Sequence, residues 1–298
     1  MRRCTVYALV LLLTLAPAAW AGSIALLLSE NSGPYAEFAT SLNDALDGSE
    51  WKIVNVSKTA TGAPPGDVIV SAGSDALRKA LASRGATPIL ATLLTRHNYE
   101  KILAESGRNQ SRVTAIFLDQ PPARQAAFLR KLLPQQKQIG MLVSTETRGL
   151  ATQYRQAFKN AGLTLDSEET NGQDSLLSEI NTLLARVNVL LAIPDGIIYK
   201  RDNIKAILVT SYRHQRPVIA FSAPFVTAGA LAALYTTPAQ IARQAAELIS
   251  NAGTTLPPPM PPSQFSIAIN QNVASALGLS IPDENVIRRA ILAESASQ

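Results

Sequence analysis

Short runs of β-branched and aliphatic residues alternate with helical patterns through most of this chain of 298 residues. Such alternation is typical of a parallel sheet covered by helices. A first set of expected strands lies at residues 23–28, 51–56, 67–71, 88–92 and 113–118. After Pro121 and Pro122, a second set follows at 139–143, 163–165, 187–193 and 218–221, with helices between most strands. The pattern predicts an α/β fold in which two doubly wound parallel-sheet lobes flank a cleft.

The C-terminal part is less regular. A strand is expected at 230–235, a helix at 238–250, a strand at 264–269 and a short helix at 273–277. Residues 256–262 contain five prolines, so this stretch is predicted to be an extended connector. The link at 58–66 is unusual, because consecutive parallel strands normally need a helix between them. Either a helix has been lost there or the strands pair differently.

The N-terminus has the three parts of a secretory signal peptide. Arg2 and Arg3 form a short positive region, an apolar run follows from Val6 to Leu15, and Ala19 and Ala21 form a small-residue cleavage site. We expect cleavage after Ala21, which assigns residues 1–21 to the signal. Because the apolar run is shorter than the roughly 20 residues that a membrane span needs, the mature protein is expected to be soluble and not membrane-spanning.

The mature chain is nearly balanced in charge and lacks cysteine. Removing Arg2 and Arg3 leaves 25 Lys and Arg against 22 Asp and Glu, or +3, and no dense basic run suggests a nucleic-acid partner. Cys4 leaves with the signal, which excludes disulfides and thiol catalysis. His97 and His214 lack companions at metal-ligand spacing, and no catalytic or nucleotide-binding motif occurs. The sequence therefore predicts no metal, no cofactor and no enzymatic activity.

Ligands of open parallel sheets bind beyond the carboxyl ends of the strands. The polar and aromatic residues expected at that edge are Ser29, Glu30, Asn31, Tyr35, Gly73, Ser74, Thr95 and Arg96 from the first lobe, and Ser144, Thr145, Asp195, Ser222 and Phe225 from the second. Gly73 and Ser74 are the most informative, since a glycine, a hydroxyl and the free N–H groups of a helix start can cradle a carboxylate or another anion. The alternative is that Ser74 only caps its helix.

Several short segments carry a resemblance to a known family. They are VIVSAGSDA at 68–76, the run 113–125, LAIPD at 191–195, PVIAFS at 217–222, GALAAL at 229–234 and IARQAA at 241–246. In order and spacing they resemble the substrate-binding proteins of bacterial ABC transporters with the type I periplasmic-binding fold, in the branch that includes binders of tryptophan and other aromatic amino acids. The resemblance covers essentially the whole mature chain.

The resemblance implies two discontinuous lobes joined by three crossings. These would lie near 118–120, near 235–237 and in or just after the proline stretch. The N-terminal lobe would then comprise residues 22–119 plus 236–262, and the C-terminal lobe residues 120–235 plus 263–298. It also implies a ligand trapped when the lobes close.

Asp195 is expected to pair with a ligand ammonium, because it matches the Pro-Asp pair of the family. The family commonly continues with Asn, whereas this chain has Gly196, so one expected polar contact is missing. The alternative is that Asp195 and Gly196 simply form a turn. Tyr35 or Phe225 could stack on an apolar or aromatic ligand, although an isolated Phe is more often a core residue. Asp195 and Ser74 together suit a small amphiphile such as an amino acid.

The functional expectation is a periplasmic solute-binding protein that delivers a small molecule to an inner-membrane ABC permease. Closure of the lobes around the ligand would produce the form that the permease recognises. The alternative is a periplasmic sensor or accessory ligand-binding protein without a permease. The missing helix at 58–66 and the loss of Asn after Asp195 motivate that alternative.

Overall fold

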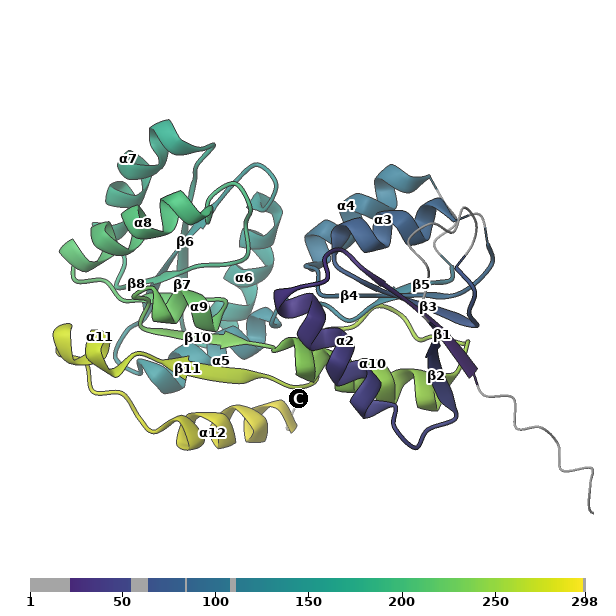
Figure 1. Cartoon of the computed structure of the whole chain (residues 1–298). Helices are drawn as coiled ribbons and strands as arrows, with labels where there is room; N and C mark the ends of the chain where they lie inside the picture. The colour runs from purple at the N-terminus through teal and green to yellow at the C-terminus, as the bar shows by residue number, and fades with distance from the viewer. Residues whose placement is uncertain (1–21, 55–63, 84, 108–110, 297–298) are drawn as a thin grey trace, which may run out of the picture.

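The computed structural model describes residues 22–54, 64–83, 85–107 and 111–296. The expected signal peptide lies outside these residues, as does most of the unusual link at 58–66. Two α/β lobes lie side by side, each built around its own sheet (Figure 1). The expectation of two lobes with helix-covered parallel sheets is therefore confirmed.

The first lobe contains a five-stranded, fully parallel sheet in the order β2-β1-β3-β4-β5. Its strands are β1 (Gly22–Leu28), β2 (Trp51–Val54), β3 (Val68–Ala72), β4 (Ile89–Thr92) and β5 (Val113–Ala115). Its helices are α2 (Gly33–Ala45), α3 (Ser74–Ala82), α4 (Arg96–Ser106) and α10 (Pro238–Ala252). Helices on both faces bury every residue of the central strand β3, which explains why all of its residues except Ser71 are apolar.

The second lobe contains a six-stranded sheet in the order β11-β10-β9-β8-β6-β7, in which only β11 runs antiparallel to its neighbour among the described pairings. The strands are β6 (Gln138–Val143), β7 (Thr164–Glu169), β8 (Val189–Leu191), β9 (Val218–Ala220), β10 (Ala232–Tyr235) and β11 (Ser266–Ile269). The helices are α5 (Pro122–Leu132), α6 (Arg148–Asn160), α7 (Gln173–Leu184), α8 (Arg201–Arg213), α9 (Ala223–Thr227), α11 (Gln271–Ala276) and α12 (Glu284–Ala296).

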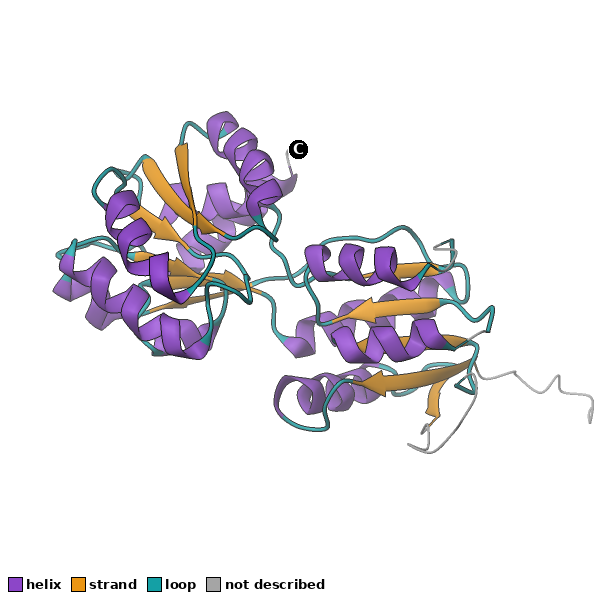
Figure 2. Cartoon of the chain, turned by 90° about the horizontal axis from the view of Figure 1, so that it is seen from above, coloured by secondary structure: helices purple, strands orange, loops and turns teal. Residues whose placement is uncertain are grey.

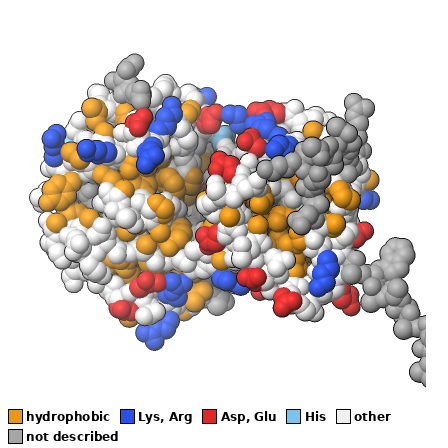
Figure 3. All heavy atoms as spheres, viewed as in Figure 1, with side chains coloured by type: hydrophobic (Ala, Val, Ile, Leu, Met, Phe, Trp, Pro, Cys, Tyr) orange, Lys and Arg blue, Asp and Glu red, His pale blue; other side chains and the backbone are white. Residues whose placement is uncertain are grey.

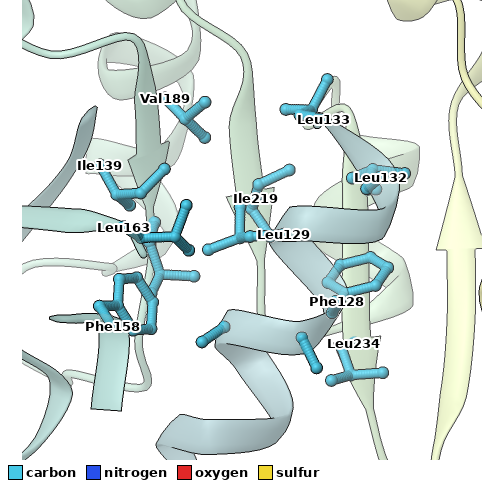
Figure 4. Packing of buried hydrophobic residues seen from close by; sticks show 14 of the residues in the cluster. Phe128, Leu129, Leu132, Leu133, Ile139, Phe158, Leu163, Val189, Ile219 and Leu234 are labelled. Carbon is cyan, nitrogen blue, oxygen red and sulfur yellow. The ribbon is translucent and has the colours of Figure 1, made fainter. Parts of the chain in front are cut away.

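Helices α5 and α6 pack against one face of this second sheet. Figure 4 shows Phe128 and Leu132 of α5 and Phe158 of α6 packed with Ile139 and Ile219 from the strands, and all five are buried. Burying side chains of this size contributes about 1.5–3 kcal/mol each. Core burial of this kind can hold the lobe together without a disulfide, and the described residues contain no cysteine.

The chain passes between the lobes at three places: after β5, after β10 and before β11 (Figure 2). The proline stretch runs along the edge of the first sheet, where Met260 pairs with Ile116 in a parallel bridge. There the N–H of Met260 donates to the carbonyl of Ala115 at 2.9 Å, and the N–H of Phe117 donates to the carbonyl of Met260 at 3.0 Å. The stretch is thus extended, as its composition predicts.

A buried hydrogen-bond network joins the three crossings. The Nε2 of Gln120, on the first crossing, donates to Oγ1 of Thr236 on the second at 2.5 Å. The Thr236 hydroxyl donates in turn to the carbonyl of Gln264 on the third crossing at 2.9 Å. Arg124 at the start of α5 donates to Gln120 Oε1 at 2.8 Å and to the carbonyl of Pro262 at 3.0 Å. We call these side chains the hinge network.

The structure adds elements that the sequence patterns did not indicate. Helices α9 and α12 were not expected, and β7 continues beyond the expected 163–165 to Glu169. The unusual link after β2 is explained in part by pairing, because β2 and β3 do not neighbour each other but flank β1 on opposite sides. Within the described part of that link, residues 64–67, no helix is present.

Candidate functional site

A cavity of about 750 Å³ lies between the lobes, within the size range of small-ligand sites. Both lobes and the first two crossings line it, and most of the lining residues are apolar or aromatic. The lining residues are Gly33, Pro34, Tyr35, Glu37, Leu93, Thr95, Leu118, Asp119, Gln120, Gln125, Tyr154, Ala192, Ile193, Pro194, Phe221, Ser222, Ala223, Pro224, Leu234, Tyr235, Thr236, Thr237 and Pro238.

Asp119 is the carboxylate on the first crossing, four residues after the end of the edge strand β5. Its Oδ2 accepts a hydrogen bond from the backbone N–H of Arg96, the first residue of α4, at 2.5 Å. Burial raises the pKa of this carboxyl group, against the opposing effect of the Arg96 N–H and the nearby Arg96 charge. A raised pKa means that the ionised form lacks part of the stabilisation that water would provide. A cationic ligand group would supply it.

Four aromatic side chains contribute to the cavity wall: Tyr35 from the first turn of α2, Tyr154 from α6, Phe221 after β9 and Tyr235 at the end of β10. Burial raises the pKa of Tyr154 far above its ordinary range, and the charge of Asp119 adds to the effect. Burial also raises the pKa of Tyr35, with a further contribution from Glu30. These phenols therefore stay neutral and can stack on a ligand or donate a hydrogen bond.

Gln125 of α5 also lines the cavity and is only 4% exposed. Its Oε1 has no hydrogen-bond partner among the described residues. An unpaired buried acceptor costs about 1–3 kcal/mol, so a ligand donor that reached this oxygen would recover free energy.

An ion pair connects the lobes beside the cavity. Lys101 of α4 donates to Oε1 of Glu146, in the loop after β6, at 2.6 Å, and His97 lies 3.8 Å from the same carboxylate. Figure 3 shows charged side chains of both signs gathered at the upper part of the boundary between the lobes. The exposed pair is screened by solvent and contributes little by itself.

Three of the thirteen residues expected at the ligand-binding edge, Tyr35, Thr95 and Ser222, line the cavity. Thr95 and Ser222 occupy the N-cap positions of α4 and α9, and the Thr95 hydroxyl accepts from the N–H of Asn98 at 3.1 Å. The other ten are not among the lining residues: Ser29, Glu30, Asn31, Gly73, Ser74, Arg96, Ser144, Thr145, Asp195 and Phe225.

Gly73 and Ser74 lie at the carboxyl edge of the first sheet, as expected. Their roles at the start of α3 differ from the expected ones. Helix α3 begins at Ser74 and its N-cap is Gly73, so the alternative that Ser74 is the cap is wrong. The hydroxyl of Ser29 takes over the capping function by accepting from the N–H of Ala76 at 3.0 Å. Ser29 thus serves α3 through a long-range contact that no local pattern indicates.

Asp195 is buried and fully engaged within its own lobe. Its Oδ2 accepts from Thr147 Oγ1 at 2.6 Å and from the N–H of Ser144 at 3.3 Å. Its Oδ1 accepts from the N–H groups of Ile197 at 2.8 Å and Ile198 at 3.0 Å. Burial alone would raise the pKa of Asp195, yet these hydrogen bonds outweigh it and leave the pKa lowered. The carboxylate ties the loop after β8 to the loop after β6.

Phe225 lies in the core of the second lobe, with 3% of its surface exposed. Its ring meets Phe221 and Tyr199 edge to face, with centroids 5.6 Å and 5.8 Å apart. Helix α9, which was not expected, turns Phe225 inward and leaves the preceding Phe221 on the cavity wall.

Sequence reasoning missed Asp119, Gln120, Gln125, Tyr154, Phe221 and Tyr235. Asp119 had a usable signal, because it follows an apolar strand directly, as the predicted residues do. Gln125 and Tyr154 had none, since they lie within amphipathic helices whose orientation toward the other lobe is a tertiary property.

Two parallel-sheet lobes with a ligand-sized cavity between them define the type I periplasmic-binding-protein fold. The family of ABC transporter substrate binding proteins matches residues 43–292, and the chain belongs to that family. No match was found among the curated proteins. In the described parts of the chain, no helix has both the length and the apolar character needed to cross a bilayer.

Solved structures with this fold include three that align over nearly the whole chain. The ABC domain from Streptococcus pneumoniae in complex with L-Trp is 18% identical, with a TM-score of 0.60 and coverage of 90% of this chain and 97% of that one. A conserved domain protein from Vibrio cholerae is 19% identical, with a TM-score of 0.61 and coverage of 92% and 98%. The ligand-free, open structure of CD0873, a substrate binding protein with adhesive properties from Clostridium difficile, is 17% identical, with a TM-score of 0.66 and coverage of 88% and 96%. At these identities the similarity demonstrates the fold.

Proposed function

We propose that the protein is a periplasmic solute-binding protein that traps a small amphiphile between its lobes and delivers it to an inner-membrane ABC permease. The observation that carries this proposal is the cavity of about 750 Å³, walled by residues of both lobes and of the first two crossings. A ligand there contacts both lobes at once, so it favours the closed arrangement over the open one. Family membership and the signal-peptide pattern of residues 1–21 support the assignment.

Within this proposal, the ligand contacts are assigned to residues that line the cavity. They include the predicted Tyr35, Thr95 and Ser222, together with Asp119, Gln125 and Tyr154. A role for Ser74 or Asp195 in a more closed arrangement stays a prediction.

A thermal-shift screen of the mature protein against amino acids, small carboxylates, amines and nucleosides tests the function. A ligand that binds only the folded state raises its stability by about 2.7 kcal/mol at a concentration of one hundred times Kd, so a binder must raise the melting temperature. We further expect the radius of gyration from small-angle X-ray scattering to fall when that ligand is added. If no compound shifts the melting temperature, the accessory-protein alternative is favoured over transport.

A further inference from the structure

The charged side chains on the cavity wall are all acidic among the residues that the structure describes. Glu37 comes from α2 and Asp119 from the first crossing, and no described Lys, Arg or His lines the cavity. We propose that the cavity binds a small organic cation, an ammonium group on an apolar body with a ring, and disfavours ligands that carry a carboxylate. This inference rests on the proposed function, since it names the class of solute that the protein takes.

Two arginines adjacent in sequence to cavity residues have guanidinium groups that already contact other protein groups. Arg96 lies over the ring of Phe117, with 4.6 Å between its Cζ and the ring centroid. Arg124 belongs to the hinge network, where it donates to Gln120 Oε1 at 2.8 Å and to the carbonyl of Pro262 at 3.0 Å. Neither arginine is itself among the residues that line the cavity.

Helix N-termini are the other common site for a carboxylate, and α2, α4, α9 and α10 all begin at the cavity. In α2, α9 and α10, a proline at the first or second position removes one backbone N–H donor. In α4, the N–H of Arg96 is already bonded to Asp119 at 2.5 Å and that of Asn98 to Thr95 at 3.1 Å. Each of these helix N-termini therefore has fewer free backbone N–H donors for an anionic ligand.

Hydrogen-bond acceptors remain available on the wall beside the hydroxyl groups of its tyrosines and of Ser222. An ionised carboxylate offers about four lone-pair sites, and the backbone N–H groups of Arg96 and of Asp119 itself occupy two of those of Asp119. Gln125 adds an unpartnered Oε1 on a side chain that is 4% exposed, within the described part of the protein. An ammonium group carries up to three N–H donors and no acceptor, so it matches this set.

The aromatic residues complete the match. Tyr35, Tyr154, Phe221 and Tyr235 stand on the wall together with Leu93, Leu118, Ile193 and Leu234. Ring faces attract a cation placed over them, and the aliphatic side chains favour an apolar body. A ligand with both an ammonium group and an apolar body would contact the acidic and the apolar residues of the wall at the same time.

Three compounds with the same phenyl ring differ in the charged groups that they carry: 2-phenylethylamine, phenylalanine and 3-phenylpropionate. Comparing them separates the effect of ligand charge from that of the apolar body. In titration calorimetry with the mature protein, we expect the amine to bind at least tenfold more tightly than the amino acid, and the carboxylate to give no binding heat. Equal or tighter binding of the amino acid or the carboxylate would overturn the cation inference, while the solute-binding function would stand. Failure of 2-phenylethylamine, tyramine and tryptamine to bind would also overturn it, and any other solute found in the thermal-shift screen would then support the function alone.

Asp119→Asn removes the negative charge of the carboxylate while the side chain keeps nearly the same size. We expect this variant to bind the amine at least tenfold more weakly. Glu247→Gln on the exposed face of α10 removes the same charge away from the cavity, so its amine affinity should equal that of the wild type. Circular dichroism and melting curves verify the fold of both variants. Should Asp119→Asn not fold, the exposed Glu37→Gln provides a second removal of a cavity charge, with weakening in the same direction expected. Equal amine affinity in the cavity and control variants would contradict the inference.

Discussion

At the scale of single residues, two aspartates show how the surroundings decide what a carboxylate does. Asp195 accepts four hydrogen bonds from its own lobe, and its pKa is lowered despite burial. Asp119 accepts hydrogen bonds from the backbone N–H groups of Arg96 and of Asp119 itself, and burial still raises its pKa. The first therefore serves mainly to hold two loops together, whereas the second has acceptor capacity left for a ligand.

Gly73 illustrates a residue whose position tolerates no side chain. Its φ of +92° is rarely adopted by other residues, and a Cβ there would lie 2.5 Å from Ser29 Oγ and 2.7 Å from Tyr35 Cε1. We expect Gly73→Ala to lower the free energy of unfolding by at least about 1–2 kcal/mol, the usual cost of forcing a side chain into a left-handed conformation. Denaturation in urea measures this loss.

Gly149→Ala is the matched control for that substitution. Gly149 lies in α6 with an ordinary φ, and a Cβ added there would meet nothing within 4 Å, so alanine should be neutral or slightly stabilising. If the two alanine variants had equal free energies of unfolding, the structure around Gly73 would have to accommodate the added Cβ without loss of stability, which contradicts the prediction.

At the scale of elements, α10 depends on its first turn. The Thr237 hydroxyl accepts from the N–H of Gln240 at 3.2 Å, and Oε1 of Gln240 accepts from the N–H of Thr237 at 2.9 Å, which completes a capping box. We expect Thr237→Ala to lower the free energy of unfolding by about 1 kcal/mol, because the N–H of Gln240 loses its acceptor. Thermal or urea denaturation measures the change.

Thr237→Ser retains the hydroxyl and should recover most of that stability. A serine variant as unstable as the alanine variant would instead assign the loss to the missing methyl group.

Most helices and strands could be predicted from the sequence because their apolar residues are buried in a periodic pattern. The exceptions have local causes. Helix α9 has only five residues, too few to display a helical period, and α12 mixes buried Ile287 and Ile291 with exposed Val286 and Leu292. The extra length of β7 was missed because Ser167 to Glu169 are polar, as suits the outermost strand of the sheet.

At the scale of the whole molecule, the hinge network connects the lobes through buried polar contacts. Its central pair, Gln120 and Thr236, is separated by 116 residues in sequence, and both side chains are at least nine-tenths buried. In a double-mutant cycle with Gln120→Ala and Thr236→Val, we expect a coupling energy of about 0.5–3 kcal/mol, as for other contacting pairs in one network.

The exposed amide pair of Gln156 and Asn160 on α6, with Nε2 and Oδ1 2.9 Å apart, is the matched control within one lobe. Its coupling should be only about 0.2–0.5 kcal/mol, typical of helix-surface pairs. A hinge coupling no larger than this control would mean that the network does not hold the crossings together.

The sequence by itself determined that the chain forms two helix-covered sheets. Apolar runs such as Val68–Ala72 alternate with amphipathic helices, and few arrangements bury both. It also placed Tyr35, Thr95 and Ser222 at the strand ends, where the cavity lies. Only the tertiary structure decided which polar groups remain for a ligand. Oδ1 of Asp195 is occupied by its own turn, but Oδ2 is occupied by donors from a loop about fifty residues away. Gln125 and Tyr154 reach the cavity because of how the lobes pack against each other. These long-range contacts and the lobe packing are not encoded in any local pattern.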